Sequence, residues 1–97
     1  MLNFIICDDN KSILDKLSKM LETIFINNNF DAQVSYTSTD AQNLLDFVSS
    51  SKVDVLLLDI NLKSDISGLE IAKQVRAHNK NCYFIFTTGH LEYAFAA

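Results

Sequence analysis

The chain of 97 residues contains 48% hydrophobic and 21% charged residues, a composition typical of one folded domain rather than a disordered chain. Twelve acidic against eight basic residues give a net charge of −4, so we expect no direct contact with nucleic acid, whose binders carry a basic surface. No apolar run approaches the roughly 20 residues of a membrane span, and no signal-peptide pattern opens the chain, so we expect a cytoplasmic domain.

The first predicted elements are a strand and a helix. The apolar run Asn3–Cys7 is typical of a strand that is buried on both faces. From Ser12 onward, apolar residues recur at offsets of three and four, which predicts an amphipathic helix that ends near residues 27–29. Either Asn10 or Ser12 can cap its start.

The rest of the chain repeats this alternation of strand and helix. Strands are predicted over Ala32–Thr37, Val53–Leu58 and Cys82–Phe86, and helices over the segments Ala41–Val48, Leu69–Val75 and Leu91–Ala97. Strands that alternate with helices through short loops form a parallel sheet with right-handed crossovers and helices on both faces. The predicted fold is therefore an α/β, doubly wound parallel sheet.

The two cysteines carry no predicted chemistry. Cys7 and Cys82 lie far apart in apolar segments, and neither belongs to a metal-type cysteine pair or to a dense disulfide framework. We interpret both as reduced, buried thiols that act as small apolar side chains.

Carboxylates and hydroxyls follow three of the predicted strands. Asp8 and Asp9 follow the first strand, Asp59 follows the third, and Thr87 and Thr88 follow the fourth. Ligands of an open parallel sheet bind beyond the carboxyl ends of its strands. Three carboxylates that meet there repel one another by roughly 4 kcal/mol per pair at an effective dielectric of 20, so they need a cation. Mg²⁺, which prefers oxygen ligands and shares its shell with phosphoryl groups, is the predicted cofactor.

Each of these residues alone has a simpler interpretation. A single aspartate after a strand is usually a turn or cap residue, and an acidic pair is often a solvated helix N-terminus. Their coincidence at one edge of the sheet favours a functional site instead.

Taken together, these motifs resemble the receiver domain of two-component response regulators, along the whole chain. The runs that carry the resemblance are Ile5–Asn10, Val55–Leu62, Gly68–Ala72 with its spacing to Arg76, and Phe84–His90. Within that family, the long proline-free loop 59–68 and the ending His90–Phe95 resemble regulators of the accessory gene regulator and LytTR type.

The resemblance implies a role for each site residue. Asp59 would be the phosphoacceptor, and Asp8 and Asp9 would bind Mg²⁺ together with Asp59 and the backbone carbonyl of Asn61. Thr88, which the small Gly89 follows, would be the switch hydroxyl. The implied fold is flavodoxin-like, with strand order 2-1-3-4.

The chain also departs from the family pattern at its end. A receiver continues into a fifth strand, a lysine that pairs with the phosphoryl group, and a fifth helix, so residues 1–97 are expected to be a C-terminally incomplete receiver. Lys73 and Lys80 lie in or after the third predicted helix and cannot replace that lysine. Regulators of the LytTR type also carry a C-terminal DNA-binding domain, so we expect the output domain to lie outside residues 1–97. We expect such a form to self-associate, because the strand Cys82–Phe86 becomes an unprotected sheet edge.

The implied function is a signalling module. A sensor histidine kinase would donate a phosphoryl group to Asp59, and the change would control a C-terminal, DNA-binding output domain; no enzymatic activity is expected beyond this transfer. One alternative is a degenerate receiver that acts without phosphate. Another is a hydrolase of the haloacid dehalogenase type, which also forms an aspartyl phosphate but needs a second aspartate where this chain has Asn61.

Overall fold

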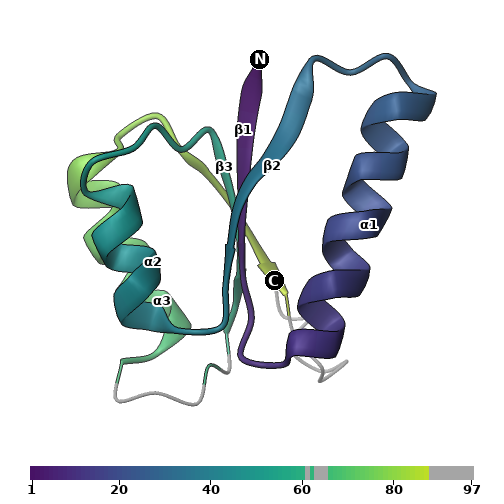
Figure 1. Cartoon of the computed structure of the whole chain (residues 1–97). Helices are drawn as coiled ribbons and strands as arrows, with labels where there is room; N and C mark the ends of the chain where they lie inside the picture. Colours follow the sequence, from purple (N-terminus) through teal and green to yellow (C-terminus); the bar gives the residue numbers. More distant parts are fainter. Residues whose placement is uncertain (61, 63–65, 88–97) are drawn as a thin grey trace.

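The computed structural model describes residues 1–60, 62 and 66–87, which form a four-stranded parallel sheet between helices (Figure 1). The strands are β1 (Leu2–Cys7), β2 (Ala32–Ser38), β3 (Val55–Asp59) and β4 (Tyr83–Thr87), and the helices are α1 (Lys11–Asn27), α2 (Ala41–Val48) and α3 (Gly68–His78). Within this described part, no helix combines the length and the apolar character that crossing a membrane requires.

The strand order is β2-β1-β3-β4, with every pairing parallel, as predicted. Helix α1 lies on one side of the sheet, and α2 and α3 lie together on the other (Figure 1). This arrangement confirms the doubly wound, flavodoxin-like α/β fold. Because β1 and β3 are neighbours in the middle of the sheet, the residues that follow them emerge side by side.

Alternate residues of the central strands supply a core on each face of the sheet. Ile5, Leu56 and Leu58 are fully buried against the side chains of α2 and α3. On the opposite face, Ile6 and Leu57 pack with Leu14 of α1. The continuous apolar runs of β1 and β3 thus reflect burial on both faces.

Polar side chains fix the start of each helix. The Asn10 side chain accepts hydrogen bonds from the backbone amides of Ser12 and Ile13, which settles the two predicted alternatives in favour of Asn10. Asp40 caps α2 by accepting from the amide of Asn43 at 2.9 Å, and Ser67 caps α3.

Each strand differs from its predicted bounds by one or two residues, and the two largest differences are in β3 and β4. The third strand begins at Val55 rather than Val53, although Val53 is only 4% exposed. Val53 is buried before the regular pairing starts, so its apolar character reports burial and not strand structure. The fourth strand is shifted by one residue, to Tyr83–Thr87. The helix predicted over Leu91–Ala97 lies outside the described residues.

Candidate functional site

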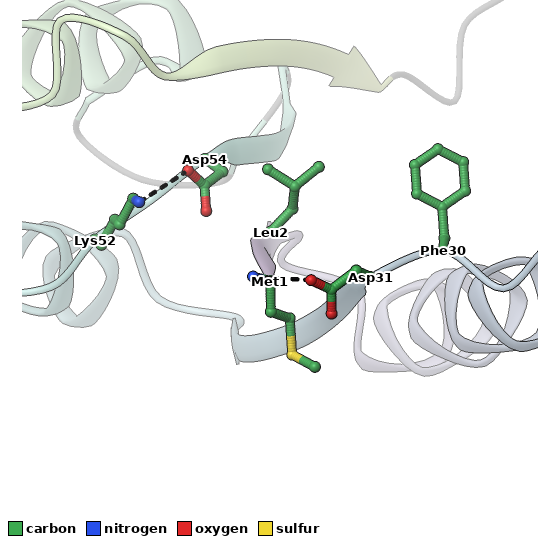
Figure 2. Close-up of a pocket in the computed structure, with 6 residues that line it drawn as sticks. All are labelled: Met1, Leu2, Phe30, Asp31, Lys52 and Asp54. Carbon is green, nitrogen blue, oxygen red and sulfur yellow. Dashed lines mark ion pairs between the residues drawn. The ribbon is translucent and has the colours of Figure 1, made fainter.

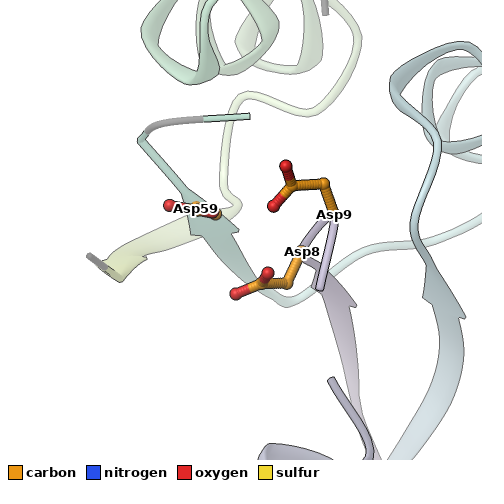
Figure 3. Close-up of side chains that lie close together, drawn as sticks. All are labelled: Asp8, Asp9 and Asp59. Atoms are coloured by element: carbon orange, nitrogen blue, oxygen red, sulfur yellow. The ribbon is translucent and has the colours of Figure 1, made fainter. Parts of the chain in front are cut away.

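Three carboxylates meet at the carboxyl ends of the two central strands. Asp8 and Asp9 directly follow β1, and Asp59 is the last residue of β3. One oxygen from each lies within 4.8 Å of the others. Figure 3 shows Asp8 and Asp9 at the end of β1 with Asp59 beside them at the end of β3. The structure therefore brings together the three carboxylates that the sequence places at one edge.

The backbone around Asp8 holds its carboxylate in a buried position. The Asp8 amide donates to the carbonyl of Ser38 at the end of β2 (3.1 Å), and one carboxylate oxygen accepts from the amide of Asn10 (2.9 Å). Asp8 is only 4% exposed and Asp59 is 8% exposed, whereas Asp9 is partly exposed. The site thus opens to solvent on the side of Asp9.

Burial and neighbouring charge both oppose ionisation of Asp8. Burial is the larger cause that raises the pKa of the Asp8 carboxyl, and the negative charges of Asp59 and Asp9 raise it further. The hydrogen bond from the Asn10 amide lowers this pKa and offsets part of the effect. A cation among the three carboxylates would relieve both penalties.

The donor set fits Mg²⁺. This ion prefers carboxylate oxygens, retains several waters, and binds at about 2.1 Å, so two directly bound oxygens lie at most about 4.2 Å apart. The three oxygens lie within 4.8 Å of one another, so the three carboxylates would hold one such ion together with water. Asp8, Asp9 and Asp59 are the described residues that could hold it.

The neighbouring thiol is not a ligand. Cys7 is fully buried, and burial together with the surrounding aspartates raises the pKa of its thiol to about 12. The thiol stays protonated at neutral pH, and its sulfur is not among the ligand atoms that meet in the cluster of Asp8, Asp9 and Asp59. Cys7 and Cys82 are both free and buried, as predicted.

Two predicted site residues, Asn61 and Thr88, lie outside the described residues. Their neighbours are placed close to the site. The last residue of β4, Thr87, pairs in register with Asp59, and its carbonyl accepts from the amide of Ile60 at 3.1 Å.

Lys73 lies in α3, where it forms an exposed ion pair with Glu70.

Ser38, which is only 7% exposed, helps to position Asp8 through its backbone carbonyl, a role that the sequence did not predict. Its hydroxyl accepts from the amide of Asp40 (3.0 Å) and donates to the Asp40 carbonyl (2.8 Å). Because the backbone carbonyl of Ser38 makes the contact with the Asp8 amide, no side-chain pattern in the sequence signals this role.

A hollow lies at the opposite, amino ends of the strands (Figure 2). It is lined by Met1, Leu2, Phe30, Asp31, Lys52 and Asp54. Its charges are already paired, since the N-terminal ammonium lies 3.2 Å from Asp31 and Lys52 lies 3.9 Å from Asp54. The cluster of Asp8, Asp9 and Asp59 lies at the other end of the sheet.

Comparison with known proteins identifies the family. Residues 4–97 match the model of the response regulator receiver domain. The chain belongs to this family. Among curated proteins, this receiver domain is 26% identical over 93 residues to the transcriptional regulatory protein ComA of Bacillus subtilis, a match that spans 93% of this chain and 40% of ComA. It is 29% identical over 87 residues to the transcriptional regulatory protein NatR of the same organism, over 90% of this chain and 35% of NatR.

Solved receiver structures share the fold. The receiver domain of AraT from Geobacillus stearothermophilus superposes with a TM-score of 0.79 at 26% identity, covering 98% of this chain and 70% of that one. The response regulator TrrA of Thermotoga maritima, solved in complex with Mg²⁺ and BeF, has a TM-score of 0.78 at 26% identity, covering 96% of this chain and 74% of that one. The chain thus spans less than half the length of the curated regulators and about three quarters of these solved chains.

Proposed function

We propose that this receiver domain accepts a phosphoryl group on Asp59 in a Mg²⁺-dependent transfer from a sensor histidine kinase. The observation that supports the proposal is the cluster of Asp8, Asp9 and Asp59 at the carboxyl ends of β1 and β3. Family membership supports it independently, and TrrA, whose structure contains Mg²⁺ and BeF, is a relative of comparable fold.

In the proposed reaction the Asp59 carboxylate is the nucleophile. One of its oxygens forms a bond to phosphorus, the bond between phosphorus and the kinase histidine breaks, and its electron pair returns to the imidazole. Asp8 and Asp9, with Asp59, would hold Mg²⁺, which when bound neutralises negative charge on the phosphoryl oxygens. The transfer modifies the chain's own Asp59, so the domain is not proposed to turn over a substrate.

Two further roles belong to the proposal. The backbone carbonyl of Asn61 would be another metal ligand, and the Thr88 hydroxyl would donate to a phosphoryl oxygen once Asp59 is modified. Both residues directly extend described parts of the site, since Asn61 follows the Asp59–Ile60 peptide and Thr88 follows Thr87.

The proposed output is control of a separate domain. ComA and NatR are both named transcriptional regulatory proteins, and each is more than twice as long as its match to this chain. We therefore propose a C-terminal, DNA-binding output domain, with the LytTR type as our prediction, and a receiver that itself contacts no DNA. The two free thiols fit the reducing cytoplasm that we propose as its location.

The two alternatives explain the site less well. A degenerate receiver would not need three buried or half-buried carboxylates, whose mutual repulsion weakens the fold. A hydrolase of the haloacid dehalogenase type needs a second aspartate two residues after the nucleophile, and that position is Asn61.

The test is phosphorylation of the intact protein by a small phosphodonor, with Mg²⁺ and with a chelator. We expect alkali-labile, Mg²⁺-dependent label on the wild type and none on Asp59→Asn. The matched control is Asp54→Asn, which changes a carboxylate at the amino end of the same strand and should keep the label. Equal labelling of wild type and Asp59→Asn would refute the proposal.

A further inference from the structure

The first residue of α3 lies unusually close to the backbone of the proposed phosphoacceptor. A Cβ atom built on Gly68 would be 2.4 Å from the carbonyl oxygen of Asp59, 3.0 Å from Cα of Ile60 and 3.2 Å from the carbonyl carbon of Asp59. All three are backbone atoms, so rotation of a side chain cannot make room. Ordinary contacts begin at 3.4 Å, and a methyl group would therefore require a displacement of about 1 Å.

The neighbouring elements hold both sides of this contact in place. On one side, α3 is anchored by Ile71 and Val75, which are fully buried. On the other side, the amide of Ile60 donates to the carbonyl of Thr87. A methyl group at position 68 must therefore shift either the helix or the peptide that carries Asp59.

Gly68 is not required for its backbone conformation. Its φ is negative, and it is a helical residue, so alanine could adopt the same backbone angles. Helix propensity alone favours alanine over glycine. Any loss caused by alanine here must therefore arise from the contact with Asp59 and Ile60.

We propose that Gly68 is a positioning residue for Asp59: the missing side chain lets α3 seat against the Asp59–Ile60 peptide and fixes the Asp59 carboxylate relative to Asp8 and Asp9. This inference rests on the proposed function. A displacement of about 1 Å in a reacting group can reduce a rate by about 10²-fold. We expect a loss of that order in phosphorylation, with weaker Mg²⁺ binding.

The experiment compares Gly68→Ala with Ser67→Ala in the intact protein. Ser67→Ala removes the cap of the same helix without adding bulk near Asp59, so it reports what a less stable α3 does on its own. Three quantities are measured for each: the unfolding midpoint in denaturant, the Mg²⁺ affinity from amide shifts of residues 8, 9 and 59, and the initial rate of labelling by a small phosphodonor per folded molecule.

Gly68→Ala should be labelled about 10²-fold more slowly than the wild type and should bind Mg²⁺ more weakly. Ser67→Ala should lower the unfolding midpoint but keep the labelling rate and the Mg²⁺ affinity within about twofold of the wild type. Wild-type behaviour of Gly68→Ala, or equal losses in both variants, would overturn the inference. If Gly68→Ala is partly unfolded, an osmolyte is added to restore the folded state before the measurement. If Gly68→Ala fails to fold even with the osmolyte, Gly68 is required for folding, and the inference that it positions Asp59 is overturned.

The readouts separate this inference from the proposed function. If the wild type takes no label, the proposed function fails, and Mg²⁺ affinity alone decides the role of Gly68. A Mg²⁺ affinity of Gly68→Ala within twofold of the wild type would then contradict the positioning role of Gly68.

Discussion

At the scale of one residue, the surroundings of Asp8 destabilise its charged carboxylate and so lower the stability of the fold. Its carboxylate is buried beside Asp9 and Asp59, and burial followed by their charge raises its pKa. The three carboxylates have oxygens within 4.8 Å of one another, and charges at that separation repel by roughly 3 to 4 kcal/mol per pair at an effective dielectric of 20. Ionisable groups whose surroundings oppose their charge in this way are typical of functional sites.

Asp8→Asn should therefore stabilise the metal-free protein. The amide removes one buried charge, and its oxygen can still accept from the Asn10 amide, so we expect the free energy of unfolding at pH 7 to rise by about 1 kcal/mol. Denaturant unfolding with a chelator measures it. The control is Asp15→Asn, an exposed partner of Lys11, which should change stability by less than about 0.5 kcal/mol. Destabilisation by Asp8→Asn would contradict this account of the site.

The Cys7 thiol should be unreactive in the native protein. Its pKa of about 12 leaves almost no thiolate at pH 8, because the thiolate forms only as the pH rises toward 12. In the native protein at pH 8, a thiol reagent should modify neither Cys7 nor Cys82. In denaturant the reagent should modify both, and mass spectrometry distinguishes the two results. Rapid native modification of Cys7 would show that the end of β1 is not closed as described.

At the scale of elements, the start of α1 links the fold to the site. The side chain of Asn10 caps α1, while its backbone amide donates to Asp8. Asn10→Ala should lose only the side-chain hydrogen bonds to the amides of Ser12 and Ile13. We expect a loss of about 1 kcal/mol in unfolding free energy. Asn43→Ala, at an exposed position inside α2, is the matched control and should cause no loss. Equal stabilities of the two variants would contradict the capping role.

The elements also show what the sequence could and could not predict. The runs in β1 and β3 are apolar enough to identify buried strands. Because the carboxyl ends of parallel strands lie at the same edge of a sheet, the sequence alone predicted that Asp8, Asp9 and Asp59 lie close together. The contact between Gly68 and the Asp59 peptide could not be predicted, because it depends on how closely α3 approaches β3. The role of Ser38 likewise depends on a backbone hydrogen bond between neighbouring strands.

At the scale of the whole molecule, β4 is the least covered part of the described sheet. It forms an edge of that sheet, and its side chains remain accessible on both faces: Tyr83 is 73% exposed, Ile85 48% and Phe86 37%. An apolar edge without charge or proline is a template for pairing with another chain.

A chain of these 97 residues should therefore self-associate at tens of micromolar, as measured by sedimentation. Ile85→Lys places a charge on the β4 edge and should shift the chain toward monomer. Ile26→Lys, at a 74% exposed position at the end of α1, is the control and should not. A monomeric wild-type chain at these concentrations would show that β4 is protected.

The position of the phosphoryl group can be read directly by reductive trapping. Borohydride reduces an aspartyl phosphate to the corresponding alcohol, and peptide mapping then identifies the residue that carried the phosphoryl group. After incubation of the intact protein with Mg²⁺ and a small phosphodonor, we predict reduction at Asp59 alone, and none when a chelator replaces Mg²⁺. Reduction at Asp8 or Asp9, or at no residue while the protein binds Mg²⁺, would contradict the assignment of Asp59 as the phosphoacceptor.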